Sequence, residues 1–309
     1  MRSIQKILFP TDFSETSQQA MAWAIFLAQQ HEAELLVLHA TVLHGEEPGN
    51  PVYHLADAEA AYRVAESAAG ERMQEIFAAH EDHPLSIRIL QRRGISADGI
   101  VLDFAREEEV DLIVMGTHGR RGLGRLILGS VTEAVVREAP CPVVTLRGGT
   151  EDTAHEGNAL EDIQRIVVPL DFSAGSQQAL AEAKELAAVY GAQLDLIHVV
   201  QPLAYPQSYF PGATSAYVAD YAAIGQQAKA SLQRIAEEHG LEGASVHVTE
   251  GYPATAIVDY AKRHGADLIV LSTHGLTGVA HLFLGSVAEK VVRLAECPVW
   301  TVRGKGSES

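Results

Sequence analysis

The chain has 309 residues, of which 47% are hydrophobic and 20% are charged, an ordinary globular composition with material for about two domains. Its formal net charge of −17 argues against a general nucleic-acid binder, because phosphate backbones require a basic face. The two cysteines, Cys141 and Cys297, are too few for a disulfide framework, and no apolar stretch approaches the roughly 18 residues of a transmembrane helix. These properties predict a cytoplasmic protein without a transmembrane segment.

Strand and helix signals alternate along the chain. An apolar run over 6–10 predicts a strand, 14–31 predicts a helix with Ser14 as candidate N-cap, and 33–40 predicts a second strand. A long helix over 55–80, a strand over 85–91, a helix over 95–109, a strand over 111–116, a helix over 130–138 and a strand over 142–147 are predicted to follow. This alternation predicts βαβ units, and therefore a parallel sheet with helices on both faces.

The same pattern then occurs a second time. Residues 7–28 match residues 166–187, and residues 111–147 match residues 267–303, which indicates duplication of a whole domain. The segment between the copies is polar and contains glycine, as exposed linkers do. We therefore expect a first domain over 1–147, a linker over 148–162, a second domain over 163–303 and a tail over 304–309.

A short acidic motif follows the first strand of each copy: Pro10, Thr11 and Asp12, then Pro169, Leu170 and Asp171. Ligands of open α/β sheets bind beyond the carboxyl ends of the strands. The aspartate could accept hydrogen bonds from ribose hydroxyls or an adenine amino group, or help to hold a divalent metal against phosphates. The alternative, which the motif alone favours, is an Asx-type turn at the strand-to-helix corner.

A glycine-rich segment follows the fourth strand, with Gly116 and Gly119 before Gly129 and Ser130. Glycines let the backbone approach a phosphate, and the N–H groups at the start of the next helix attract an anion. A capping box is the alternative, because Ser130 to Glu133 has the required spacing, as does Ser286 to Glu289. A capping box does not explain the recurring glycines, so we favour phosphate binding.

Other positions are less informative. At the end of the second strand, His39-Ala40 and His198-Val199 could read an adenine edge through backbone groups, although ordinary strand residues are the favoured interpretation there. His118 and His274 recur in the glycine segments and are interpreted as spacers rather than bases. The chain has no Walker-type P-loop, no GxGxxG after the first strand, no GxSxG and no HExxH.

Taken together, these features resemble the universal stress protein family. Its signature, G-x2-G-x9-G followed by Ser or Thr, is met fully in the first copy, whereas Ser272 replaces the first glycine in the second. The resemblance covers nearly all of both copies. It implies an α/β fold of two tandem Rossmann-like domains of the adenine nucleotide alpha hydrolase-like type. Each would hold a five-stranded parallel sheet of order 3-2-1-4-5.

The resemblance also implies a ligand, ATP or AMP, and leaves open whether Mg²⁺ or Mn²⁺ accompanies it. The implied nucleotide-binding residues are Pro10, Thr11, Asp12, Ala40, Gly116, Gly119, Arg120, Gly129, Ser130, Val131 and Thr132, then Pro169, Asp171, Val199, Gly275, Gly285, Ser286 and Val287. The first site is expected to be the stronger. The Ser272 side chain narrows the approach of a phosphate to the second site. Arg120 and Arg121 could add positive charge near the phosphates of the first site, whereas Leu276 and Thr277 at the matching positions of the second copy cannot.

Single-domain members of the family dimerise through strand five, so the resemblance implies an internal pseudo-dimer of the two domains through that strand. Further homodimerisation stays open. The leading function is a stress-response protein that binds adenine nucleotide and hydrolyses ATP very weakly or not at all. No catalytic residue and no metal ligand is assigned. A true ATP-using enzyme would need a dedicated base or a lysine near the phosphates.

The alternative function is a module of the same fold that binds a partner or a small ligand, a lipid among the candidates. The variable segments 41–60 and 201–224 favour this alternative. The second of them contains aromatic residues that could line an apolar pocket, although a lid that packs on its own domain is the favoured interpretation: Tyr205, Tyr209, Phe210, Tyr217 and Tyr221.

Overall fold

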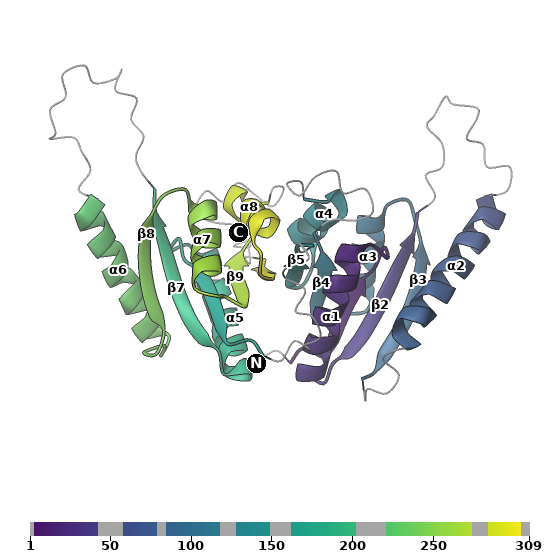
Figure 1. The fold of residues 1–309 in the computed structure, drawn as a ribbon, viewed down its shortest axis with the longest axis horizontal. Helices are drawn as coiled ribbons and strands as arrows, with labels where there is room; N and C mark the ends of the chain where they lie inside the picture. Colours follow the sequence, from purple (N-terminus) through teal and green to yellow (C-terminus); the bar gives the residue numbers. More distant parts are fainter. Residues whose placement is uncertain are drawn as a thin grey trace, which may run out of the picture. The chain divides into compact units, whose positions relative to one another are not determined.

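The computed structural model describes residues 3–42, 58–78, 85–117, 128–148, 162–201, 221–273 and 284–303. The chain divides into two compact units, Met1–Glu161 and Asp162–Ser309, and each is described by itself. Figure 1 labels their helices and strands.

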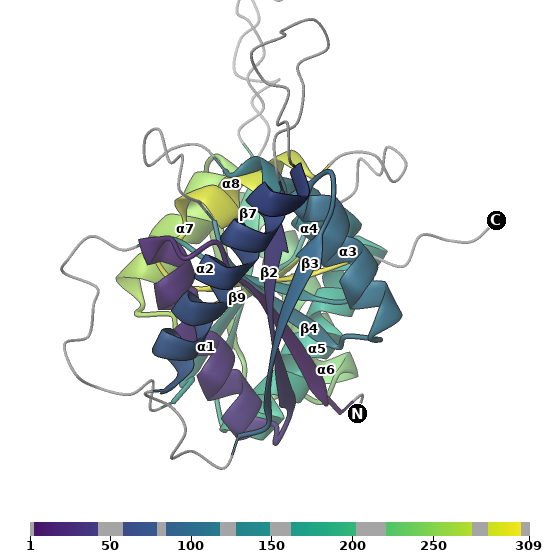
Figure 2. The same cartoon turned by 90° about the vertical axis from the view of Figure 1, so that its right-hand side faces the viewer.

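The first unit alternates strands and helices from its N-terminus. Its elements are β1 (Lys6–Pro10), α1 (Glu15–Gln30), β2 (Glu34–Thr41), α2 (Ala58–Ala78), β3 (Ile87–Arg93), α3 (Ala97–Glu107), β4 (Leu112–Gly116), α4 (Ser130–Glu138) and β5 (Val143–Leu146). The strands lie in the order β3-β2-β1-β4-β5, and neighbours within the unit are parallel. Helices α1 and α2 lie on one side of this sheet and α3 and α4 on the other (Figure 2). The α/β class that the sequence predicted is confirmed.

The second unit repeats this arrangement. Its elements are β6 (Arg165–Pro169), α5 (Ala174–Tyr190), β7 (Gln193–Val200), α6 (Tyr221–Glu238), β8 (Ser245–Glu250), α7 (Pro253–Arg263), β9 (Leu268–Ser272), α8 (Ser286–Leu294) and β10 (Val299–Val302). The strand order β8-β7-β6-β9-β10 is again parallel throughout the unit. Both copies therefore have the strand order that the resemblance implied.

The central strands form the core of each unit because their side chains are apolar on both faces. Leu35, Leu36, Val37 and Leu38 of β2 have no exposed surface, and β4 and β9 are buried in the same way. Each such side chain contributes about 1.5–3 kcal/mol when it leaves water. The helices add one buried face each, and α1 begins at Ser14, whose hydroxyl accepts a hydrogen bond from the Ser17 N–H. The predicted N-cap is confirmed.

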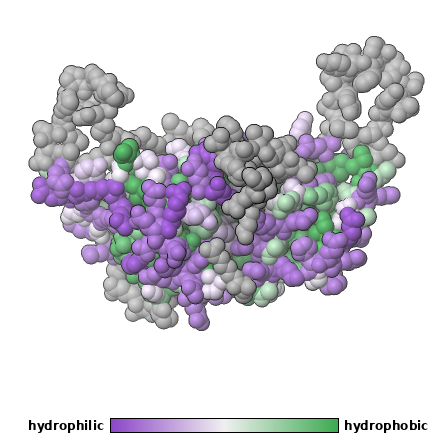
Figure 3. All heavy atoms as spheres, turned by 180° about the vertical axis from the view of Figure 1, so that it is seen from behind, coloured by the Kyte–Doolittle hydropathy of each residue, from purple (hydrophilic) through white to green (hydrophobic). Residues whose placement is uncertain are grey.

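The outer surface is mostly hydrophilic, with hydrophobic residues in separate areas on each unit (Figure 3). Within the ranges given above, no helix is long and apolar enough to cross a membrane.

The position of the candidate site follows from the topology. In the first unit β1 lies between β2 and β4, and the chain crosses from β1 to β2 in one direction and from β3 to β4 in the other. Such a reversal leaves a crevice beyond the carboxyl ends of the two central strands, where open α/β sheets bind ligands. In the second unit β6 lies between β7 and β9, so the crossover direction reverses beside it in the same way.

Candidate functional site

The corner after the first strand is built on an aspartate in both units. The Ser14 N–H and hydroxyl both donate to Asp12 Oδ1, at 3.1 and 2.6 Å. Ser173 donates in the same way to Asp171 Oδ1, at 3.0 and 2.6 Å. The Asx-type turn considered as an alternative is therefore present. It also fixes the carboxylate at the carboxyl end of the strand, so the turn and a ligand contact are compatible.

A phenylalanine and a histidine hold this corner. The Phe13 and His39 rings stack with centroids 4.6 Å apart, and His39 Nδ1 lies 2.8 Å from the Thr11 carbonyl oxygen. Because a carbonyl oxygen only accepts, Nδ1 carries the proton, and a neutral ring presents Nε2 as an acceptor. Phe172 and His198 repeat the arrangement, with 4.5 Å between the rings and 2.7 Å between Nδ1 and the Leu170 oxygen. Sequence reasoning missed this pair, although Phe and His recur at matching positions of both copies.

The same corner contains strained backbone. Phe13 has φ of 64° and Phe172 has φ of 65°, in the left-handed region that bulky residues rarely enter. Such a conformation costs about 1–3 kcal/mol and persists only where its surroundings impose it. The ring stacking, the Asx turn and the helix N-cap impose it here. The corner is therefore a rigid platform beside the crevice.

The end of the second strand exposes a usable backbone edge. The last residue of β1, Pro10, pairs with Leu38, and the Leu38 carbonyl accepts from the Thr11 N–H at 2.9 Å. Backbone groups of a strand alternate between its two neighbours, so the N–H and C=O of Ala40 point to the side where β1 has ended. Val199 has the same position, because Pro169 pairs with Ile197 at the end of β6. Both residues can therefore present a donor and an acceptor to a ligand.

The helix after the glycine segment starts at a glycine and not at a serine. Gly129 is the N-cap of α4, with φ of −63° and ψ of 139°, and its carbonyl accepts from the Glu133 N–H at 2.9 Å. Ser130 is thus the first helical residue, and within the described chain no side chain caps α4. Helix α8 begins in the same way, at Gly285 and Ser286. The capping box considered as an alternative is therefore wrong for both helices.

An uncapped helix start offers backbone donors to an anion. The N–H groups of the first turn have no partner within their own helix, and the helix dipole places partial positive charge there. In α4 these groups belong to Ser130, Val131 and Thr132, and in α8 they begin with Ser286 and Val287. The Thr132 hydroxyl itself points inward, because it donates to the Gly116 carbonyl oxygen at 2.8 Å. Only its backbone is positioned for a ligand.

Two hydrogen bonds close the base of each glycine segment. The Thr117 N–H donates to the Leu146 oxygen at 2.8 Å, and the Thr117 oxygen accepts from the Gly129 N–H at 2.9 Å. Thr273 does the same with Val302 and Gly285, at 3.0 and 2.9 Å. The helix start is thereby fixed beside the end of the fourth strand. The predicted site residues Gly119, Arg120 and Gly275 lie outside the described residues, as do His118, Arg121, His274, Leu276 and Thr277.

Gly116 has a packing role as well as a place in the signature. A Cβ at this position would lie 2.7 Å from Thr16 Cγ2 of helix α1 and 3.1 Å from the Thr16 backbone. In the second unit, where Ser272 replaces this glycine, the residue that corresponds to Thr16 is Gly175. The glycine of this pair is therefore on the strand in the first unit and on the helix in the second. Ser272 therefore fits its own unit, which gives its presence a structural explanation.

The described residues supply donors for an anion rather than groups for covalent chemistry. Burial raises the pKa of the Cys297 thiol to about 12, and Cys141 is buried. Within the part of the chain that the structure describes, no cluster of three His, Cys, Asp or Glu side chains could hold a metal ion. A carboxylate, an open strand edge and an uncapped helix start suit the ribose, base and phosphates of a nucleotide, in that order.

Comparisons with known proteins agree with this architecture. The family model described as universal stress protein family matches residues 3–147 and again residues 162–303. A universal stress protein of Mycolicibacterium smegmatis is 26% identical over 302 residues, 96% of each chain. One of Methanocaldococcus jannaschii is 35% identical over 140 residues, 45% of this chain and 82% of the relative. The crystal structure of a universal stress protein from Archaeoglobus fulgidus superposes with a TM-score of 0.67 at 24% identity, covering 99% of this chain and all of that one.

Proposed function

Because the chain belongs to the universal stress protein family and carries the family's domain twice, we propose that it binds an adenine nucleotide, ATP or AMP, at the switch point of each sheet. The observation that carries the proposal is the start of α4 and α8, which no side chain of the described residues caps and which is fixed beside the end of the fourth strand of its unit. Backbone N–H groups in this arrangement bind phosphate without any lysine.

Each part of the nucleotide then has a place in the first unit. The N–H groups of Ser130, Val131 and Thr132 hold phosphate, and the glycines Gly116, Gly119 and Gly129 let it approach, with Arg120 adding positive charge. Asp12, presented by the Pro10-Thr11 corner, accepts from the ribose hydroxyls, and the backbone of Ala40 contacts adenine. The equivalent set in the second unit is Pro169, Asp171, Val199, Gly275, Gly285, Ser286 and Val287.

The protein acts through binding, with very weak ATP hydrolysis or none, as a cytoplasmic stress-response protein. Among the described residues at these strand ends and helix starts we assign hydrogen-bond donors but no general base, and a rapid reaction would need one. Steady-state ATPase rates comparable to those of ordinary enzymes would contradict this part of the proposal. Comparing binding with and without Mg²⁺ or Mn²⁺ decides whether a metal accompanies the nucleotide.

Equilibrium dialysis of the full chain against ATP and AMP tests the proposal. We expect two bound nucleotides per chain, with the first site the tighter. The double variant Gly129→Lys with Gly285→Lys should bind none, because the lysine side chains occupy the phosphate position, and each single variant should bind one. Gly129 has φ of −63°, a value that any residue adopts, so the lysine does not strain the helix start.

The matched control is Gly243→Lys, since Gly243 lies before β8, away from the crevice, and a Cβ there meets no atom within 4 Å. This control should bind two nucleotides. Absence of binding by the unmodified chain, or full binding by the double variant, would refute the proposal.

A further inference from the structure

In the first unit a charged cluster ties helix α2 to the edge strand β3. The Arg93 guanidinium donates to both oxygens of Glu66, at 2.5 and 2.6 Å, and to Glu59 at 2.8 Å. It also lies over the Tyr62 ring, 4.8 Å from the centroid. These contacts fill the space between the first half of α2 and the end of β3.

The second unit has different residues at both ends of this tie. Buried Ala228 and Leu232 of α6 correspond to buried Ala69 and Met73 of α2, so Gly225 occupies the position of Glu66. Glu250 pairs with Val200 as Arg93 pairs with Thr41, so it occupies the position of Arg93. A glycine opposite a glutamate cannot form an ion pair. The space that the cluster fills in the first unit is therefore open here.

The result is a groove between α6 and the ends of β7 and β8, with a volume of about 610 Å³. Its lining comprises Val200, Ala222, Gly225, Gln226, Lys229, Val248, Thr249 and Glu250. Val200, Val248 and Ala222 provide apolar surface, and Gly225 leaves room because a Cβ there would meet no atom within 4 Å. The volume is in the range of small-molecule sites.

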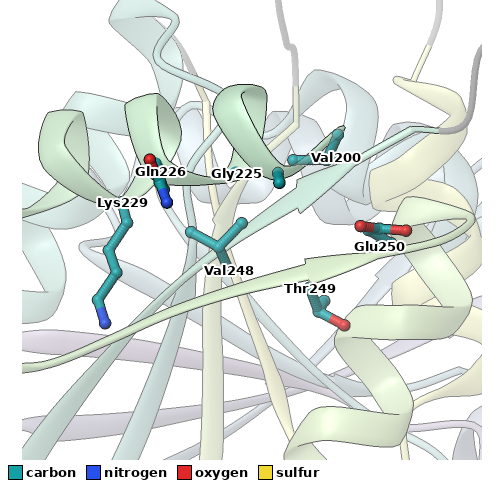
Figure 4. A pocket seen from close by; sticks show the side chains of 8 residues that line it. Val200, Gly225, Gln226, Lys229, Val248, Thr249 and Glu250 are labelled. Atoms are coloured by element: carbon teal, nitrogen blue, oxygen red, sulfur yellow. The ribbon is translucent and has the colours of Figure 1, made fainter. Parts of the chain in front are cut away.

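Opposite charges stand at the two ends of this groove. Figure 4 shows Lys229 at one end and Glu250 at the other, with Val248 between them. Neither side chain forms an ion pair with any residue that the structure describes. Two separated charges flanking an apolar surface are complementary to a ligand with an apolar middle and opposite charges at its ends.

We propose that this groove binds a short peptide with apolar side chains, its N-terminal ammonium group at Glu250 and its C-terminal carboxylate at Lys229. A nucleotide fits less well, because Glu250 repels phosphates, and a fatty acid gains no attraction from that carboxylate. The site lies under α6 and does not use the starts of α4 or α8. It is therefore distinct from the phosphate-binding helix starts, and it adjoins the adenine contact that we assign to Val199 through the neighbouring residue Val200.

Titration calorimetry of the full chain with the tripeptide Val-Ala-Val tests this site. We expect one bound peptide per chain. N-acetylation or C-amidation of the peptide should each weaken binding by about two- to fivefold, because each removes one terminal charge from an ion pair with an exposed side chain. Glu250→Gln should weaken binding of the free peptide and remove its sensitivity to acetylation. Lys229→Met should do the same for amidation.

The double variant Gly225→Glu with Glu250→Arg provides a second test, because it transplants the Glu66–Arg93 tie of the first unit into the groove. It should abolish peptide binding and keep nucleotide binding. Arg234→Met, on an exposed part of the same helix, is the matched control and should bind normally. Gly129→Lys with Gly285→Lys should still bind the peptide, which separates the two proposals. No binding of Val-Ala-Val by the unmodified chain, equal binding of the doubly blocked peptide, or retained binding in the transplant variant would each overturn the proposal.

Discussion

At the scale of single residues, Phe13 shows how a side chain can hold unfavourable backbone in place. Its φ of 64° disfavours every residue but glycine, while its ring stacks on His39. Phe13→Ala removes the ring contact but keeps the free-energy cost of the positive φ. Phe13→Gly removes the ring contact and also relieves that cost. We therefore expect Phe13→Ala to destabilise the first unit more than Phe13→Gly, by about 1 kcal/mol. Hydrogen exchange of the β1 and β2 amides measures this difference, and a glycine variant no more stable than the alanine variant would refute it.

A second residue-scale prediction concerns the contact between Gly116 and Thr16. Gly116→Ser places a Cβ 2.7 Å from Thr16 Cγ2 and should destabilise the first unit by about 1–3 kcal/mol. Adding Thr16→Gly recreates the pairing of Ser272 with Gly175 and should recover most of that loss. A double-mutant cycle on β4 hydrogen exchange measures the coupling between the two positions. Additive effects of the two changes would show that the contact is unimportant.

Residue-scale prediction from sequence succeeded where local chemistry decides the outcome. Ser14 begins a helix because a serine hydroxyl accepts from the first-turn N–H groups, and this was predictable. The N-cap of α4 was not predictable, because Gly129 and not Ser130 adopts the extended N-cap conformation. The stacking of Phe13 on His39 joins the corner after β1 to the strand β2, so no local pattern reveals it.

At the scale of elements, β7 contains a buried charge that β2 lacks. Asp195 is fully buried and accepts from Arg165 at 2.8 Å and from the Tyr260 hydroxyl at 3.1 Å, where the corresponding strand position of the first unit is Leu36. Burial, and then the Asp195 charge, raise the pKa of Tyr260, so its hydroxyl stays protonated as a donor. Removing one partner of such a pair leaves an uncompensated buried charge.

Arg165→Leu should therefore destabilise the second unit by about 3 kcal/mol. Adding Asp195→Leu and Tyr260→Phe gives the apolar pattern of Leu36 and Phe104 in the first unit, and this triple variant should be about as stable as the unmodified chain. Hydrogen exchange of β7 checks both outcomes. A triple variant as unstable as Arg165→Leu alone would show that the polar network itself stabilises the sheet.

Helix α2 should depend on pH through its tie to β3. The hydrogen bond from Arg93 lowers the pKa of Glu66 below its ordinary value of 4.5. The pair therefore stabilises the helix fully above pH 4.5, and this contribution is lost as the pH falls through the lowered pKa. Amide exchange in α2 should accelerate in that acidic window, relative to the structure-independent rate, and high salt should have the same effect.

The variant Arg93→Met should remove this pH dependence and exchange faster at neutral pH. Arg72→Met, which breaks only an exposed pair with Glu75 inside α2, is the matched control. An acid-induced acceleration that persists in Arg93→Met would assign the effect to other groups.

The elements themselves were largely predictable, because buried parallel strands are continuous apolar runs. All nine predicted elements of the first copy occur, with ends displaced by a few residues. The largest displacements of element ends occur at α2, which was predicted over 55–80 and observed over Ala58–Ala78, because its alanine-rich sequence gives no sharp boundary. The groove beside α6 was not predictable. It depends on Gly225 and Glu250 standing where the first unit has Glu66 of α2 and Arg93 of β3, and this match is visible only in the structure.

At the scale of the whole molecule, the pseudo-dimer through strand five stays a prediction of the family resemblance. The strand order of the first unit ends with β5. An isolated first domain, residues 1–147, would then present that edge to solvent, and unpaired strand edges associate. We expect this isolated domain to dimerise through that edge, measured by light scattering after size exclusion. A monomeric isolated domain would contradict the prediction.

The hydrogen bonds that join Thr117 to Gly129, and Thr273 to Gly285, have a consequence for how this protein could diversify. Each pair fixes the two ends of the glycine segment between the fourth strand and the next helix. The residues of this segment can therefore be exchanged without moving the strand before it or the helix after it. The two copies already differ there, with RRGLGRLI following Gly119 where LTGVAHLF follows Gly275. A segment fixed at both ends in this way would let one half of a tandem chain acquire a new ligand preference without a change in the other half.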